Sequence, residues 1–238
     1  MAGHSKWANI KHRKAAQDAK RGKIFTKLIR ELTVAARQGG ADADSNPRLR
    51  TALDKALSNN MKRDTIDKAV ARGSGDLDGE NYEEVRYEGY AANGVAVMVD
   101  CLTDNRQRTV SDVRHAFSKH GGNLGTDGSV AYLFNHIGMI VFENDNHEDQ
   151  ILEVALENGA DDVVNEEGVV TVITDHTNYL NVKKALHAVQ LESSFSELTM
   201  AANMKAELSE EDAQKVMTLV DVLEDLDDVQ SVYTNLNG

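Results

Sequence analysis

Residues 138–174 read GMIVFENDNHEDQILEVALENGADDVVNEEGVVTVIT. The opening apolar run, GMIVFE, predicts a strand, and apolar residues then recur at helical spacing over 148–158. Two runs rich in valine, DDVVN and GVVTVIT, predict a hairpin. A second helical pattern over 179–189 and the strand-like run SFSELTM at 194–200 follow. The order strand, helix, strand, strand, helix, strand is typical of a ferredoxin-like α/β sandwich.

The flanking sequence predicts a second sandwich around the first. Its patterns are strand, strand, helix and strand before the unit and helix and strand after it, at residues 82–90, 94–103, 106–120, 129–134, 209–225 and 229–234. Asn93-Gly94 between the first two strands is a hairpin signal. We therefore expect residues 137–203 to be inserted into a discontinuous sandwich formed by residues 80–136 and 204–238.

Three amphipathic helical patterns precede the first strand. Asn46 and Pro47 predict the N-cap and first residue of the second helix, and Asp64 is expected to cap the third. The acidic, turn-rich run GSGDLDG then marks a boundary. We expect residues 1–76 to form a basic helical domain with a flexible N-terminal arm. The whole chain is predicted to be an α+β multidomain protein, with this three-helix domain followed by two ferredoxin-like α/β sandwiches, one inserted in the other.

Charge is divided unevenly along the chain. Residues 1–72 hold 17 Lys and Arg against 7 Asp and Glu, whereas residues 73–238 hold 9 against 32. The net charge is +10 in the first section and −23 in the second, within a total of −13. This asymmetry favours a polyanionic partner for the basic end. A solvated basic face without a partner is the alternative.

Composition narrows the class of protein. A hydrophobic content of 41% and a charged content of 27% are typical of a globular chain. Cys101 is the only cysteine, which excludes an internal disulfide, and its apolar setting predicts a buried thiol in a reducing compartment. No apolar run is long enough for a membrane span or a signal peptide. We expect a cytoplasmic protein without a membrane partner, favour a monomer, and leave the oligomeric state open.

The sequence carries no strong catalytic or cofactor motif. The eight His residues form no H-E-x-x-H pattern, and one Cys cannot supply a C-x-x-C zinc site. The loop GGNLGTDG follows a predicted helix, the reverse of a dinucleotide-binding loop, so we interpret it as a helix C-cap with tight turns. The clusters NEEG, SEED and EDLDD lack the ligand spacing of a calcium loop and predict a solvated acidic face. We therefore expect no enzyme activity, no catalytic residue, no metal and no cofactor.

Candidate nucleic-acid-binding residues gather near the N-terminus. They are Lys6, Trp7, Lys11, His12, Arg13, Lys14, Lys20, Arg21, Lys23, Lys27 and Arg30. The cations suit phosphate contacts that release counterions, and Trp7 either stacks on an unpaired base or packs its segment onto the core. A secondary basic patch consists of Arg106, Arg108, Arg114 and Lys119. Asp104 and Asp112 lie beside this patch and could pair with its cations instead.

Several motifs together resemble one family. They are MAGHSKWANIKHRKAAQDAKRGKIFTK (1–27), NPRLR (46–50), ALSNNM (56–61), YEGY (87–90), DNRQRT (104–109) and FSKHGGNLGTDGSVAYLF (117–134). The chain resembles the YebC-like proteins, which are usually described as probable transcriptional regulatory proteins and whose mitochondrial relatives are translational activators. The resemblance implies a helical N-terminal domain, two α/β domains with one inserted, and a cofactor-free role on nucleic acid or the ribosome. Lys62 stands where the family often has proline, which affects local loop shape only.

Charge and resemblance together predict a non-enzymatic nucleic-acid-binding regulator of gene expression. DNA is the target that the resemblance implies. A translation factor that binds ribosomal RNA or the ribosome is the alternative, because phosphate contacts are similar on either polymer. A metabolite-sensing domain or enzyme would require a pocket with convergent polar groups.

Overall fold

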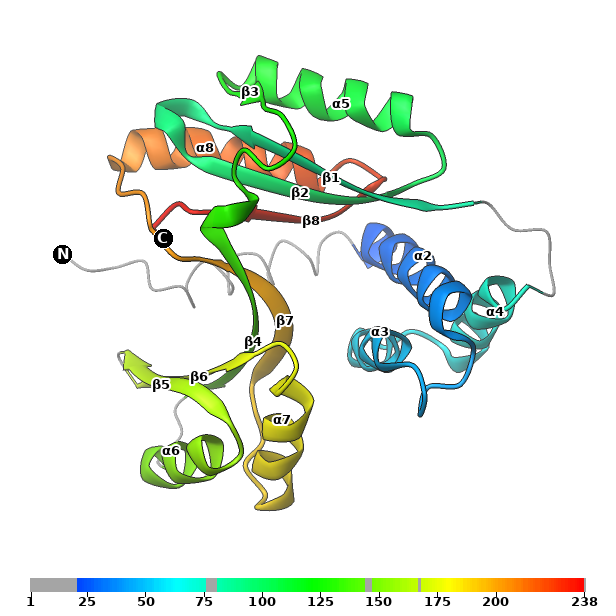
Figure 1. The fold of residues 1–238 in the computed structure, drawn as a ribbon, viewed down its shortest axis with the longest axis vertical. Helices are drawn as coiled ribbons and strands as arrows, with labels where there is room; N and C mark the ends of the chain where they lie inside the picture. The colour runs from blue at the N-terminus through cyan, green and yellow to red at the C-terminus, as the bar shows by residue number, and fades with distance from the viewer. Residues whose placement is uncertain (1–20, 76–80, 144–146, 167, 238) are drawn as a thin grey trace. The chain divides into compact units, whose positions relative to one another are not determined.

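Three helices are followed by two four-stranded antiparallel sheets with their own helices (Figure 1). The structure is a computed structural model, and it describes residues 21–75, 81–143, 147–166 and 168–237. The contacts within these residues define two compact units. One holds Tyr132–Ala206, and the other holds residues 21–131 together with Glu207–Leu236. The predicted α+β multidomain class is confirmed.

The helical part of the second unit contains α2 (Arg21–Gly39), α3 (Pro47–Ser58) and α4 (Arg63–Gly73). Leu32, Leu49 and Ile66, one from each helix, are fully buried in a shared apolar core. Gly73 ends α4 against α2, and a Cβ atom there would lie 2.2 Å from the carbonyl oxygen of Thr33. The two helices can therefore approach this closely only because residue 73 has no side chain.

One of the two predicted helix caps is correct. The side chain of Asn46 accepts a hydrogen bond from the backbone N–H of Leu49, and Pro47 is the first helical residue of α3. The predicted cap of α4 is wrong, because that helix begins at Arg63 and Asp64 lies inside its first turn. The Asp64 carboxylate is 2.7 Å from the Lys68 ammonium and faces the positive end of the helix dipole.

The inner sandwich lies in the unit Tyr132–Ala206 and follows the predicted element order. Its elements are β4 (Phe134–Glu143), α6 (Glu148–Glu157), β5 (Ala160–Glu166), β6 (Val169–Asp175), α7 (Tyr179–Ala188) and β7 (Phe195–Ala202). The sheet order is β5-β6-β4-β7. Ile140 and Phe142 of the central strand are buried against Ile151 of α6 and Leu186 of α7. Both helices therefore cover the same face of the sheet.

The outer sandwich is built from segments on both sides of the inner one. Its elements are β1 (Glu83–Tyr90), β2 (Ala96–Thr103), α5 (Arg106–Lys119), β3 (Asn123–Leu124), α8 (Glu210–Glu224) and β8 (Val229–Thr234). The sheet order is β3-β1-β2-β8. The Asn93-Gly94 hairpin signal is confirmed, with both residues at positive φ in the turn between β1 and β2. Residues Phe134 and Ala202, near the ends of the inner unit, are register partners in its sheet.

The strand predicted at residues 129–134 is wrong. Ala131–Leu133 is a short 3-10 helix, and the pairing strand of this region is the two-residue β3, within the glycine-rich loop. The reason lies in the buried side chain of Glu88, whose carboxylate accepts hydrogen bonds from the backbone N–H groups of Gly128 (2.8 Å), Val130 (2.7 Å) and Ala131 (2.7 Å). Three backbone donors that a sheet would use are therefore bound by a side chain.

The glycine-rich loop begins as predicted, as a helix C-cap. Gly121 follows α5 at φ +75°, and the backbone N–H of Gly122 donates to the carbonyl oxygen of Phe117 at 2.9 Å. The predicted burial of Cys101 is also confirmed, since it is 3% exposed and burial raises the pKa of its thiol to about 12. A buried thiol with a raised pKa is a poor nucleophile.

Candidate nucleic-acid interface

The structure describes part of the predicted binding set. Outside the described residues lie Lys6, Trp7, Lys11, His12, Arg13, Lys14 and Lys20, and the side chain of Arg21 is not described either. The three remaining cations, Lys23, Lys27 and Arg30, follow one another at i, i+4 and i+7 on α2 and so share one helical face. We call these three residues the α2 stripe.

The lysines of the α2 stripe contact the C-terminal end of α8. Lys23 Nζ donates a hydrogen bond to the carbonyl oxygen of Asp225 at 2.9 Å and lies 3.6 Å from the carboxylate of the same residue. Lys27 Nζ donates to the carbonyl oxygen of Glu224 at 2.9 Å. Carbonyl groups at a helix C-terminus lack partners within the helix and carry the negative end of its dipole. They are therefore favourable acceptors for the two ammonium groups.

Lys27 is the more dehydrated of the two lysines. Burial lowers the pKa of its ammonium below the usual value, and the negative charges of Glu224 and Asp225 offset part of that effect. Because Lys27 has lost much of its water, its hydrogen bond to α8 is the contact that compensates its charge.

Arg30 makes the most buried contact of the α2 stripe. Its Nη1 donates to Oδ1 of Asp228 at 2.9 Å and also to the carbonyl oxygen of Asp227. The side chains of Arg30 and Asp228 are only 15% and 7% exposed. The guanidinium also lies 5.3 Å from the centre of the Tyr82 ring, within the range of a cation–π contact. All three cations of the α2 stripe are therefore engaged by residues 224–228.

Asp228 connects the α2 stripe to the outer sandwich. Its Oδ2 accepts hydrogen bonds from Arg108 Nη2 at 2.7 Å and from Thr109 Oγ1 at 2.8 Å. Burial alone raises the pKa of the Asp228 carboxyl, but the bonds from Arg108 and Thr109 and the charges of Arg108 and Arg30 outweigh it, so the pKa lies below its usual value. The predicted solvated face is therefore wrong at this residue of EDLDD. Asp228 stays charged and buried because two guanidinium groups compensate it.

The secondary basic patch on α5 divides into two parts. Arg108 pairs with Asp228 and, at 2.6 Å, with Asp104. Arg106, Arg114 and Lys119 are exposed, and none of them forms an ion pair with another residue that the structure describes. These three cations therefore present their charge to solvent.

A second polar contact joins the helical part to the outer sheet. Arg48 of α3 donates from Nε to Glu31 of α2 at 2.7 Å, and its Nη1 donates to Glu84 of β1. The Glu84 carboxylate also accepts from Gln38 Nε2 at 2.6 Å. Arg48 thus holds the C-terminal half of α2 to β1, while residues 224–228 hold the N-terminal half.

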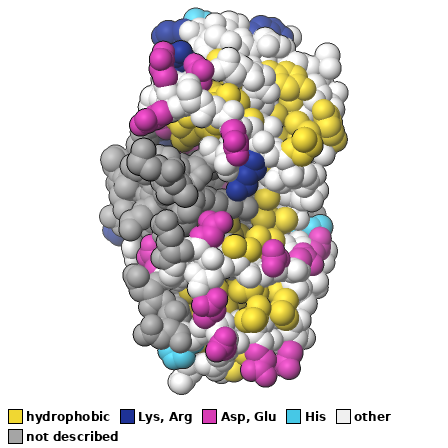
Figure 2. All heavy atoms as spheres, turned by 90° about the vertical axis from the view of Figure 1, so that its left-hand side faces the viewer, with side chains coloured by type: hydrophobic (Ala, Val, Ile, Leu, Met, Phe, Trp, Pro, Cys, Tyr) yellow, Lys and Arg dark blue, Asp and Glu magenta, His cyan; other side chains and the backbone are white. Residues whose placement is uncertain are grey.

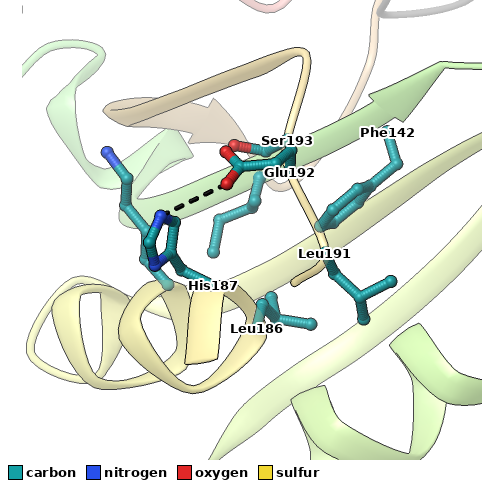
Figure 3. Close-up of a pocket in the computed structure, with 8 residues that line it drawn as sticks. Phe142, Leu186, His187, Leu191, Glu192 and Ser193 are labelled. Atoms are coloured by element: carbon teal, nitrogen blue, oxygen red, sulfur yellow. Dashed lines mark ion pairs between the residues drawn. The ribbon is translucent and has the colours of Figure 1, made fainter. Parts of the chain in front are cut away.

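A small pocket lies at the end of α7 in the inner sandwich (Figure 3). Its volume is about 60 Å³, and its lining includes Phe142, Leu186 and Leu191. His187 points toward Glu192 at its rim, and the two form an ion pair at 3.2 Å. A metabolite site usually needs about 300 Å³ or more, with polar groups that converge on the ligand. This pocket therefore offers no support for a metabolite-sensing function.

Comparison with known proteins places the chain in a family. Residues 5–76 match the family described as TACO1/YebC protein N-terminal domain, and residues 82–236 match the one described as TACO1/YebC second and third domain. The chain belongs to the TACO1/YebC family.

Relatives in the TACO1/YebC family match this chain over nearly their whole length. A probable transcriptional regulatory protein of Idiomarina loihiensis is 64% identical over 99% of this chain and 95% of its own. A protein with the same description from Francisella tularensis subsp. novicida is 60% identical over 100% of this chain and 96% of its own. A crystal structure of a conserved hypothetical protein from Aquifex aeolicus has a TM-score of 0.86 and 48% sequence identity, and covers 98% of this chain and 97% of that one.

Two kinds of feature, a membrane-spanning helix and a metal-binding cluster, are absent from the residues of this TACO1/YebC chain that the structure describes. No helix among the described residues combines the length and the apolar composition that crossing a bilayer requires. Within the same residues, no group of three or more His, Cys, Asp or Glu side chains is arranged to hold a metal ion.

Sequence reasoning missed three residues whose long-range contacts hold elements of this chain together. Asp228, Arg48 and Glu88 all bind partners far away in the sequence, and no local spacing marks such partners. A signal was present in DNRQRT, where Asn105 caps α5 while Arg108 and Thr109 both reach Asp228. Several polar side chains of this motif therefore serve a buried carboxylate, and of its two arginines only Arg108 forms ion pairs among the described residues.

Proposed function

We propose that this chain is a non-enzymatic, nucleic-acid-binding regulator of gene expression, with duplex DNA as its target. The observation that carries the proposal is the division of charge, +10 over residues 1–72 and −23 over residues 73–238. Cations gathered in one section release counterions when they contact phosphates, and this release drives binding. The name of the relatives, probable transcriptional regulatory protein, supports the same function.

The contact surface in this proposal combines the basic N-terminal set with the exposed part of α5. Arg106, Arg114 and Lys119 have their charge available for phosphates, as described above. On the face that Figure 2 shows, the described residues carry Asp and Glu side chains scattered among hydrophobic ones. Acidic side chains repel a polyanion, which favours binding at basic residues.

Fluorescence anisotropy with a labelled duplex across a salt series tests the proposal. Changing Lys11, Arg13 and Lys14 together to Ala should reduce the slope of log affinity against log salt by about 2.7, because each phosphate contact contributes about 0.9. The matched control changes Lys183, Lys184 and Lys205 to Ala, which removes the same charge from the chain outside the predicted surface. Its slope should stay at the wild-type value. A triple N-terminal variant that keeps wild-type slope and affinity would overturn the proposal.

The nature of the nucleic acid is tested separately, in cells. Sedimentation of lysate on a sucrose gradient, with and without DNase, locates the chain. A position at the top of the gradient together with a promoter footprint supports DNA as target. Co-migration with ribosomal particles that persists after DNase would instead assign the basic surface to ribosomal RNA.

A further inference from the structure

The α2 stripe already has an anionic occupant within the chain. Residues 224–228 read EDLDD, and we call them the acidic turn. The acidic turn presents the carbonyl oxygens of Glu224, Asp225 and Asp227 and the carboxylates of Asp225 and Asp228 to the α2 stripe. Every cation of the stripe binds at least one of these oxygens.

The acidic turn offers the α2 stripe the same kind of acceptor oxygens that the phosphate backbone of a nucleic acid offers. A nucleic acid strand offers a row of anionic oxygens to lysine and arginine, and the acidic turn offers a row of carboxylate and helix-terminal carbonyl oxygens to the same groups. A phosphate oxygen that bound Lys27 or Arg30 would have to replace the oxygen bound now. Polyanion and acidic turn therefore compete for the same donors.

The two oxygens of Asp228 have separate partners, which makes such an exchange feasible. Oδ1 binds Arg30 of the α2 stripe, whereas Oδ2 binds Arg108 and Thr109 of the outer sandwich. If Arg30 leaves, the carboxylate keeps its bonds to Arg108 and Thr109 and is not left as an isolated buried charge. Asp228 can therefore stay in place while the stripe is released.

We propose that the acidic turn is an internal competitor that holds the α2 stripe until a nucleic acid displaces it. Binding through residues 23–30 then includes the release of α2 from the end of α8. This inference rests on the proposed nucleic-acid-binding function. It adds that Lys23, Lys27 and Arg30 cannot bind phosphate while they are bound to the acidic turn.

A covalent bridge between stripe and turn tests this competition. In the double variant Lys23→Cys and Asp225→Cys, the new thiols replace an ion pair whose side chains are each 44% exposed. A short bismaleimide joins them, and Cys101 does not react because it is buried with a raised pKa. The matched control is the same variant capped with N-ethylmaleimide, which carries no bridge.

The bridged protein should bind a labelled duplex at least about fivefold more weakly than the capped protein. Its salt slope should be smaller by about 1.8, because Lys27 and Arg30 are lost as phosphate contacts at about 0.9 each. Equal affinity and slope in the two forms would overturn the internal competitor and leave the proposed function standing. No binding by the capped form or the wild type would overturn the proposed function itself.

A charge-matched pair of variants gives a second, independent measurement. Asp225→Asn removes one carboxylate that pairs with the α2 stripe, and Glu210→Gln removes one exposed carboxylate at the other end of α8. Both lower the net negative charge by one. The internal competitor predicts that Asp225→Asn strengthens duplex binding at least about twofold more than Glu210→Gln does. An equal gain from both variants would show that only overall charge matters, against the proposal.

Discussion

Glu88 and Asp228 are both buried carboxylates, with 5% and 6% of their surfaces exposed, but their partners differ in kind. Glu88 accepts three hydrogen bonds from the backbone of one short segment, residues 128–131. Asp228 accepts its bonds from side chains on separate elements, Arg30, Arg108 and Thr109. Backbone donors cannot rotate away, whereas an arginine side chain can exchange one acceptor for another. The buried charge of Glu88 therefore fixes a loop, whereas the buried charge of Asp228 makes a contact that can be released.

The largest expected effect comes from removing the fixed carboxylate. Glu88→Ala leaves the buried N–H of Val130 and the partly buried N–H groups of Gly128 and Ala131 without their acceptor. We expect the free energy of unfolding to fall by about 3–4 kcal/mol, measured by urea denaturation. Glu83→Ala, at an exposed residue of the same strand, is the control and should change it by less than about 0.5 kcal/mol. Equal losses in the two variants would remove the distinction between Glu88 and an ordinary surface acid.

A smaller loss is expected at the releasable carboxylate. Asp228→Asn keeps the shape and one acceptor, but its amide group faces donors of Arg30 or Arg108 and cannot accept from them. The expected cost is about 2 kcal/mol by the same urea measurement. A loss equal to or greater than that of Glu88→Ala would contradict the idea that Asp228 is the more adaptable of the two.

The pH dependence of stability sharpens the comparison further. Burial raises the pKa of the Glu88 carboxyl, but the hydrogen bonds from Val130, Gly128 and Ala131 outweigh it, so this pKa, like that of Asp228, is lowered in the folded state. Each group therefore contributes its full stability above its ordinary pKa, 4.5 for Glu88 and 3.8 for Asp228, and loses it as the pH falls through the lowered value. Unfolding free energies measured from pH 6 to pH 2.5 should fall less steeply below pH 3.8 in Asp228→Asn than in the wild type, by up to about 1.4 kcal/mol per pH unit. If unfolding free energy fell in parallel with pH in the wild type and in Asp228→Asn, this result would contradict the lowered pKa of Asp228.

The smallest effect is expected where a carboxylate is exposed. The pair Asp64–Lys68 has side chains that are 78% and 73% exposed. Asp64→Ala should change the free energy of unfolding by no more than about 0.5 kcal/mol, and 1 M NaCl should abolish even that difference. Thermal denaturation at low and high salt provides the check. A change above 1 kcal/mol would show that exposure does not rank the carboxylates of this chain.

Apolar periodicity was enough to predict most elements from the sequence. Apolar residues recur at regular spacing in the inner sandwich and in α2, α3, α5 and α8. In such patterns the apolar character of a residue is enough to indicate that its side chain is buried. The strand at 129–134 failed because Glu88, about forty positions away, binds its backbone. The domain boundaries at residues 137 and 203 stay a prediction, which excision of the segment between them can test.

The contacts of the candidate binding residues were less predictable than the fold. Charge located the basic end, but charge alone does not show which cations have an internal partner. Lys27 and Arg30 look equivalent to their neighbours in the sequence, yet they bind acceptors almost 200 positions away. The EDLDD cluster was interpreted as a solvated face for the same reason. Within the predicted α5 patch, long-range pairing engages Arg108 and leaves Arg106, Arg114 and Lys119 without an ion pair among the described residues.

The pairing of Phe134 with Ala202 also bears on the order in which the chain folds during synthesis. The pairing of β2 with β8 forms late, because the register partners Cys101 and Val229 are 128 positions apart. If the inner sandwich forms first, its paired ends remove 68 of those positions from the loop that must close. Halving a loop lowers the entropic cost of closing it by about 0.6 kcal/mol. An early-folding inner sandwich therefore shortens the loop between the two segments of the outer sheet, and β8 then completes that sheet.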